Sequence, residues 1–182
     1  LFLHGADAQV NYCCRNYPKI SGVKTYFIGG SHDESHFKQD GHDVLKAIGE
    51  QRKDLIPLGY HGAHVNFGKV KVYLHHPVGG VPYARSYRMQ KVIEQMSPQE
   101  KPHILLMGHL HIGCHLPQYR NVEGFQVPCF QAQTPYLKAK GLYPSLGCIV
   151  LEIRRSDLLP EGGFVSVKPE WIYYYNPLEN DY

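Results

Sequence analysis

The stretch His103-Ile104-Leu105-Leu106-Met107-Gly108-His109-Leu110-His111 indicates the class of fold. A short apolar run of this kind is typical of a buried β-strand, and here a glycine and two histidines follow it at once. The same order, a β-like run and then histidine, occurs twice more. The other two places are Val23–Ile28 before Gly30-Ser31-His32-Asp33, and Val70–Leu74 before His75-His76-Pro77. Because ligands gather at strand ends in α/β sheets, these three segments together predict a metal or phosphate site.

The rest of the chain alternates between helix and strand patterns before it becomes rich in strands. Helices are predicted over 7–16, 42–53 and about 84–96, and strands over 23–28, 55–58, 64–67, 70–74, 103–107, 124–130, 146–154 and 164–167. Gly68-Lys69 is a hairpin signal. Alternation followed by consecutive strands predicts an α/β sandwich.

Composition describes an ordinary globular protein of one domain. Of the 182 residues 43% are apolar and 19% charged, and the formal charge of +3 neither requires nor excludes nucleic acid as a partner. No signal peptide and no membrane-spanning apolar run is present, so no membrane partner is expected. Five cysteines without a C-x-x-C pair favour free thiols in a reducing, cytoplasmic setting.

The order of the three histidine segments resembles the calcineurin-like metallophosphoesterases, in particular their phage and bacterial members. That family has Asp-x-His, Gly-Asp-x-x-Asp, Gly-Asn-His-Asp/Glu, a lone His after a strand, and Gly-His-x-His. The last three motifs occur here in order, and Gly-His-Leu-His is a full match. The resemblance covers residues 23 to about 155. Further sequence similarity to the phage and bacterial members lies at Gln9, Tyr17-Pro18, Ala84–Arg88, Lys101–Leu106 and Gln133-Thr134-Pro135.

This resemblance implies which fold the chain has and how much of that fold residues 1–182 contain. It implies a sandwich of two stacked mixed β-sheets flanked by helices, with the metal site at one sheet edge. The first two motifs are absent before residue 30. Residues 1–182 are therefore expected to be a single metallophosphoesterase-like domain that is N-terminally incomplete and lacks its first strands.

The resemblance also implies the roles of the site residues. His109 and His111 would bind one metal ion each, His75 would be the lone ligand, and Ser31 stands where an asparagine normally binds metal. His32 would be the general acid and Asp33 the carboxylate that orients it. His75 is preferred over His76 as the ligand. On an extended backbone His109 and His111 would point to the same side, so both imidazoles would face one site.

The missing motifs leave the ligand set without a bridging carboxylate. Asp7 is the only acidic residue before Asp33, and it lies in a predicted helix. Two cations about 3.5–4 Å apart normally need such a carboxylate between them. Either these residues lack the first strands of a longer protein, or the protein has lost its first metal.

The resemblance therefore predicts a metal-dependent phosphoesterase with, in full-length form, two divalent ions. Mn, Fe, Ni and Zn all suit imidazole ligands. The substrate is a phosphate ester, and phosphodiesters such as nucleic acids are among the candidates. The alternative is a non-catalytic binding or scaffold protein that retains the fold. A nucleic-acid-binding module that uses Tyr83, Arg85, Tyr87 and Arg88 has less support than either; a solvated helix face is the simpler interpretation of that stretch.

Overall fold

A computed structural model describes residues 3–156, 158 and 164–174. The chain divides into two compact units. Unit 1 contains residues 1–63 and 74–78, and unit 2 contains residues 64–73 and 79–182. The expectation of a single domain stays a prediction, and each unit is described by itself below.

Unit 1 is built from three helices and a pair of parallel strands. The elements are α1 (Ala6–Asn16), β1 (Thr25–Gly29), α2 (Ser31–Asp40), α3 (Val44–Gln51) and β2 (Leu55–Tyr60). β1 and β2 pair in parallel from Thr25 opposite Leu55 onward. Helices α1 and α3 pack together through a small core of Ala6, Val10, Val44 and Leu45. These are the apolar residues that recur at helical spacing, and this spacing accounts for the two helices.

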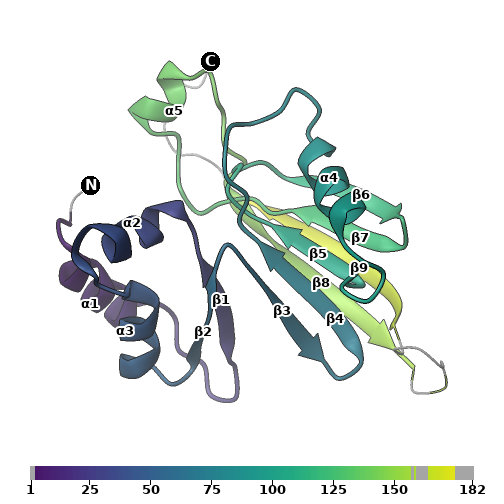
Figure 1. The fold of residues 1–182 in the computed structure, drawn as a ribbon, viewed down its shortest axis with the longest axis horizontal. Helices are drawn as coiled ribbons and strands as arrows, with labels where there is room; N and C mark the ends of the chain where they lie inside the picture. The colour runs from purple at the N-terminus through teal and green to yellow at the C-terminus, as the bar shows by residue number, and fades with distance from the viewer. Residues whose placement is uncertain (1–2, 157, 159–163, 175–182) are drawn as a thin grey trace. The chain divides into compact units, whose positions relative to one another are not determined.

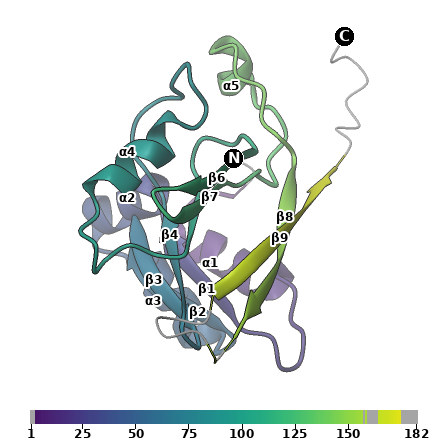
Figure 2. The same cartoon turned by 90° about the vertical axis from the view of Figure 1, so that its right-hand side faces the viewer.

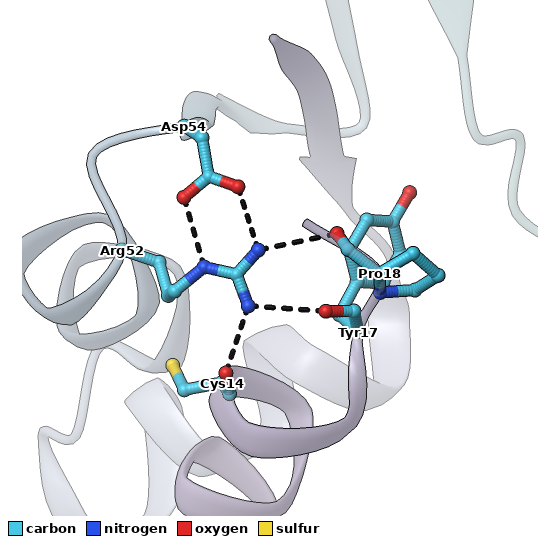
Figure 3. A network of polar contacts seen from close by, with 5 residues as sticks. All are labelled: Cys14, Tyr17, Pro18, Arg52 and Asp54. Atoms are coloured by element: carbon cyan, nitrogen blue, oxygen red, sulfur yellow. Dashed lines mark hydrogen bonds and ion pairs between the residues drawn. The ribbon is translucent and has the colours of Figure 1, made fainter. Parts of the chain in front are cut away.

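Arg52 joins the end of α1 to the start of β2 (Figure 3). Its guanidinium donates Nε and Nη2 to the two oxygens of Asp54, at 2.8 and 2.6 Å. It also donates Nη1 to the carbonyls of Cys14 and Tyr17, at 2.8 and 3.1 Å, and Nη2 to that of Pro18 at 3.2 Å. The hydrogen bond from Arg52 lowers the pKa of Asp54 to about 2. This planar fork therefore satisfies carbonyls left open where α1 ends.

Unit 2 contains most of a five-stranded mixed sheet, covered by one helix. Its elements are α4 (Tyr87–Gln95), β5 (Ile104–Met107), β6 (Cys114–Tyr119), β7 (Val122–Gln126), α5 (Pro135–Ala139), β8 (Gly147–Arg155) and β9 (Phe164–Tyr173). Strands β3 (Gly62–Phe67) and β4 (Val70–His75) complete the sheet in the order β3-β4-β5-β7-β6. β7 is parallel to β5 and antiparallel to β6.

The core of unit 2 lies between α4 and this sheet, where Figure 1 shows α4 beside β6 and β7. It consists of Met89, Ile93, Leu105, Met107 and Val122, all fully buried. Gly124 lies where a Cβ would be 3.3 Å from the Met89 sulfur. The absence of a side chain at this position therefore lets α4 approach β7 closely.

Strands β8 and β9 form a long antiparallel ribbon, which Figure 2 shows in yellow-green and yellow. The pairing runs from Gly147 opposite Tyr173 to Arg155 opposite Phe164. Trp171 of β9 lies 6.3 Å from the ring of Phe125 on β7, so the ribbon contacts the sheet within unit 2. Within the described residues, none of the helices combines the length and apolar character needed to cross a bilayer.

The predicted α/β class is confirmed, with mixed pairing in the five-stranded sheet. Three elements were not predicted: α2, β6 and α5. α2 buries none of its residues, and β6 contains a proline and alternates weakly, so neither shows strong hydrophobic periodicity. Helix α4 begins at Tyr87 and not near Ala84. The predicted strand 164–167 is the first part of β9, which continues to Tyr173.

Candidate functional site

The first histidine segment of unit 1 lies where β1 ends and α2 begins. Gly30 is the residue before the helix, and Ser31 and His32 are its first two residues. Ser31 is half-buried and His32 is exposed. The Asp33 carboxylate accepts the backbone N–H of Gly30 at 2.8 Å. Asp33 therefore caps α2, and its predicted part in orienting His32 stays a prediction.

The second segment of unit 1 contacts the first through His76. His75 was predicted to follow a strand that ends at Leu74; it is instead the last residue of β4, and His76 follows it. A Cβ built on Gly30 would overlap the imidazole of His76, with Cε1 at 2.6 Å and Cδ2 at 2.8 Å. The ring of His76 therefore packs on the backbone at the start of α2. Only glycine fits there, because any side chain would displace the ring.

His75 is half-buried at the end of β4. Burial lowers its pKa below the usual value for histidine, the neighbouring His76 and His61 act in the same direction, and a hydrogen bond to the His61 backbone opposes them. This environment favours the neutral imidazole near pH 7. Neutral imidazole is the form that binds a divalent metal.

His61 is the residue of this region that sequence reasoning missed. Its backbone N–H donates to Gly29 at 2.9 Å, and its carbonyl accepts from the N–H of His76 at 2.7 Å, so it joins the ends of β1 and β4. Its Nε2 lies 3.2 Å from Glu34 Oε2, and its Nδ1 is buried with no hydrogen bond to a described residue. His61 was not predicted as a site residue. Its position three residues after the predicted strand 55–58 was the available signal.

In unit 2, Gly108-His109-Leu110-His111 forms a tight turn at the end of β5. The N–H of Leu110 donates to the carbonyl of Gly108 at 2.9 Å, which closes a three-residue γ-turn around His109. His109 and His111 have φ values of 73° and 57°. The prediction of an extended backbone here is wrong, because the chain reverses directly after the strand. Left-handed conformations cost a non-glycine residue about 1–3 kcal/mol each, and such strain gathers at functional sites.

The remaining left-handed residues have simpler explanations or belong to the site region already described. Gln118, Arg120 and Asn121 lie around the turn between β6 and β7. His61 lies at the turn between β2 and β3. The strain at His109 and His111 is therefore not explained by a hairpin.

The His109 imidazole is held within unit 2 by a backbone carbonyl. Its Nε2 lies 2.8 Å from the carbonyl oxygen of Gly79. A carbonyl only accepts, so Nε2 is the donor and carries the proton. Nδ1 is then the nitrogen of His109 that could bind a metal. The second nitrogen of a metal-binding histidine commonly donates in this way.

Gln126 lies directly beside this turn. It ends β7, opposite Met107 of β5 and Cys114 of β6. The side chain is 0% exposed, and neither its amide nitrogen nor its amide oxygen has a hydrogen bond to a described residue. Such a buried amide is unfavourable unless a water molecule or a ligand satisfies it. Gln126 was not predicted as a site residue, because a lone glutamine in a β-run has no distinguishing pattern.

The described residues do not make a metal centre by themselves. Across residues 3–156, 158 and 164–174, no three His, Cys, Asp or Glu side chains are grouped so that they could hold a metal ion. Asp33 is engaged as a helix cap and one nitrogen of His109 by Gly79. His75 belongs to unit 1, and His109 and His111 to unit 2, so their predicted convergence stays a prediction.

The class that these observations define is a mixed α/β protein with histidine-bearing turns at strand ends. No protein-family model and no curated protein matches the chain. Solved structures do. A double mutant of Vps29 from Entamoeba histolytica matches with TM-score 0.42 and 14% identity over 91% of this chain and 88% of that one.

Two further matches are of the same kind. Wild-type Vps29 from Entamoeba histolytica complexed with Zn²⁺ has TM-score 0.42 and 14% identity, over 84% of each chain. Thermotoga maritima protein TM1076 has TM-score 0.38 and 19% identity, over 72% of this chain and 73% of that one. These likenesses concern the fold, and the proposals below depend on residues of this chain.

Proposed function

We propose that this chain, in its full-length form, is a metal-dependent phosphoesterase that hydrolyses a phosphate ester. The observation that carries the proposal is the strained turn at Gly108-His109-Leu110-His111. Two left-handed histidines, separated by Leu110, follow a strand that is buried except at Leu106, in a segment where no hairpin requires them. Backbone strain that persists at a pair of ligand-type residues supports a functional role for that pair.

The proposed ligands of the divalent ions are His75, His109, His111 and Ser31. One observation supports each of three of these proposed ligands. Burial lowers the pKa of His75, the Nε2–H of His109 donates to a backbone carbonyl, and Ser31 begins α2 two residues after β1 ends. Ser31 offers a short and weak neutral donor, so we expect the ion there to be bound less tightly. Mn, Fe, Ni and Zn remain the candidates, since imidazole suits all four.

His32 is the proposed general acid. It is exposed on the first turn of α2, where a phosphate ester could reach its ring. Its role would be to donate a proton to the leaving oxygen as the ester bond breaks. The fold places no carboxylate hydrogen bond on His32 within the described residues, since Asp33 bonds to Gly30.

The alternative is a non-catalytic binding or scaffold protein of the same fold. Two observations favour it. The described residues present no group of three metal ligands, and the acidic residue of the first segment serves as a helix cap. This alternative predicts that the full-length protein binds no divalent metal and cleaves no ester.

One experiment separates the two. The full-length protein is supplied with Mn²⁺ or Zn²⁺, and hydrolysis of bis(p-nitrophenyl) phosphate and metal content by mass spectrometry are measured together. For His109→Ala we expect loss of activity and a fall in metal affinity of more than about 100-fold, because groups that merely orient a metal ligand are already worth about 10–100-fold. His64→Ala, an exposed histidine on β3, is the matched control and should change neither readout.

Hydrolysis that needs no metal and survives His109→Ala would overturn the proposal. An inactive protein that also takes up no metal would establish the scaffold alternative in its place.

A further inference from the structure

The loop that precedes α4 in unit 2 carries an exposed aromatic ring and an exposed cation. Its sequence is Gly79-Gly80-Val81-Pro82-Tyr83-Ala84-Arg85-Ser86. Tyr83 is fully exposed, at 107%, and has no hydrogen bond or ring contact with any residue that the structure describes. Among the exposed large hydrophobic side chains of the described residues, that of Tyr83 is the most exposed.

The interpretation of this stretch as a solvated helix face does not apply to Tyr83 and Arg85. Helix α4 begins at Tyr87, so both residues lie before it in the loop. The helix itself buries Met89 and Ile93 against the sheet. Packing on the helix therefore does not explain why the loop exposes these two side chains.

The loop is attached to the His109 turn at its first residue. The Gly79 carbonyl accepts from His109 Nε2 at 2.8 Å, and the Gly80 carbonyl accepts from Arg88 Nη2 at 3.3 Å. Gly79 has φ 91°, and a Cβ on it would lie 2.8 Å from Arg88 Nη2. Glycine is therefore required here, because a side chain would be strained and would displace Arg88.

A second observation concerns Arg85, near the far end of the loop. Burial raises the pKa of the Cys114 thiol, and the positive charge of Arg85 acts against it. Cys114 starts β6, three residues after His111. The first residue of the loop thus contacts the segment that contains the candidate ligands of unit 2, and the charge of Arg85 acts on Cys114, three residues after that segment.

The charge of this part of the chain is one-sided. From Leu55 to Ile93 the sequence has no aspartate or glutamate, but it has three lysines and two arginines. Arg85 makes no ion pair with a described residue. Lys91 of α4, by contrast, is paired with Glu94 of the same helix. The loop therefore presents uncompensated positive charge, which is complementary to a polyanion.

We propose that residues 79–88 bind single-stranded nucleic acid and guide it to the His109 turn. Arg85 would contact a backbone phosphate, and the ring of Tyr83 would stack on an unpaired base. A fully exposed ring beside a cation suits a single strand, because bases in a duplex are stacked on one another and offer no free face. The proposal names the substrate class of the proposed phosphoesterase and rests on that function for cleavage, but not for binding.

Binding is tested without metal, so that no cleavage occurs. The full-length protein in EDTA is titrated into a fluorescently labelled oligothymidylate, and anisotropy gives the Kd. Loss of one stacked base by Tyr83→Ala should weaken binding by about 5- to 150-fold. Tyr83→Phe keeps the ring and should bind like the parent. Tyr143→Ala, an exposed tyrosine elsewhere in unit 2, is the matched control and should have no effect.

The phosphate contact is tested by salt dependence. For a single strand, each phosphate neutralised contributes about 0.7 to the slope of log K against log salt concentration. Arg85→Gln should therefore reduce the slope by about 0.7. Arg154→Gln on β8 removes an exposed arginine far along the chain and should leave the slope unchanged.

Three outcomes would overturn the proposal: no binding of the single strand, equal loss for Tyr83→Ala and Tyr143→Ala, or duplex bound as tightly as single strand with no dependence on Tyr83. The two proposals fail separately. Hydrolysis of the small ester without oligonucleotide binding removes the nucleic-acid proposal alone, whereas binding without any metal-dependent hydrolysis removes the phosphoesterase alone.

Discussion

Replacing Gln126 by methionine should stabilise unit 2. The glutamine side chain is fully buried at the end of β7, and its strand neighbours are Met107 and Cys114. Its amide nitrogen and oxygen have no hydrogen bond to any described residue. Methionine has nearly the same length and shape, and its flexible thioether packs well among other sulfur-containing side chains.

The magnitude follows from the cost of the buried amide. A buried polar group without a partner is unfavourable by about 1–3 kcal/mol, whereas an apolar group of the same shape has no such cost. Gln126→Met should therefore raise the free energy of unfolding by about 1–3 kcal/mol. For a chain of this length, each kcal/mol corresponds to roughly 2–4 °C in Tm.

The assay is urea unfolding followed by tryptophan fluorescence. Trp171 is the only tryptophan in the chain, and its ring lies 6.3 Å from Phe125, the residue next to Gln126. The signal therefore reports on unit 2. Gln133→Met is the matched control, because Gln133 Nε2 donates to the Leu142 carbonyl at 2.9 Å. Loss of that bond should destabilise the protein by about 0.5–1.5 kcal/mol, the opposite sign.

A Gln126→Met protein that is less stable than the parent by 1 kcal/mol or more would refute the reasoning. It would mean that a water molecule or ligand satisfies the amide in solution.

Two further predictions concern unit 1. In the full-length enzyme, His32→Ala should slow cleavage of esters with poor leaving groups by about 10²–10⁴-fold. Metal content and cleavage of an activated aryl ester should stay nearly normal. Equal losses of activity on both esters would show that His32 is not the general acid. The hydrogen bond from Arg52 lowers the pKa of Asp54 to about 2, whereas an aspartate in an unfolded chain has a pKa of about 3.9. The pair therefore stabilises the folded protein above about pH 4, and this contribution is lost as the pH falls toward 2. Asp54→Asn should flatten the fall in stability measured by urea unfolding between these pH values, and a mutant profile parallel to the parent's would contradict this.

Much of the secondary structure could be predicted from local pattern. Val44, Leu45 and Ile48 repeat at helical spacing and lie in α3, and the apolar run before Gly108 is β5, fully buried but for Leu106. Helix α2 could not be predicted in this way. It buries no residue, and the Asp33 carboxylate that caps it bonds to a backbone N–H three residues earlier. A cap is a contact between individual atoms and leaves no hydrophobic periodicity.

The features of the candidate site likewise separate into those that local sequence pattern predicts and those that depend on tertiary contacts. Local pattern was sufficient to predict histidines at the ends of three strands, because a strand and the residues at its end depend on nearby side chains. Three other features follow from tertiary contacts: the backbone at His109 is left-handed, His61 joins the ends of β1 and β4, and the Gly79 carbonyl holds the His109 ring. Each of these features depends on atoms that are distant in sequence or on a dihedral angle that most residues avoid. Such features are set by the packing of the whole unit, and local residue preferences do not encode them.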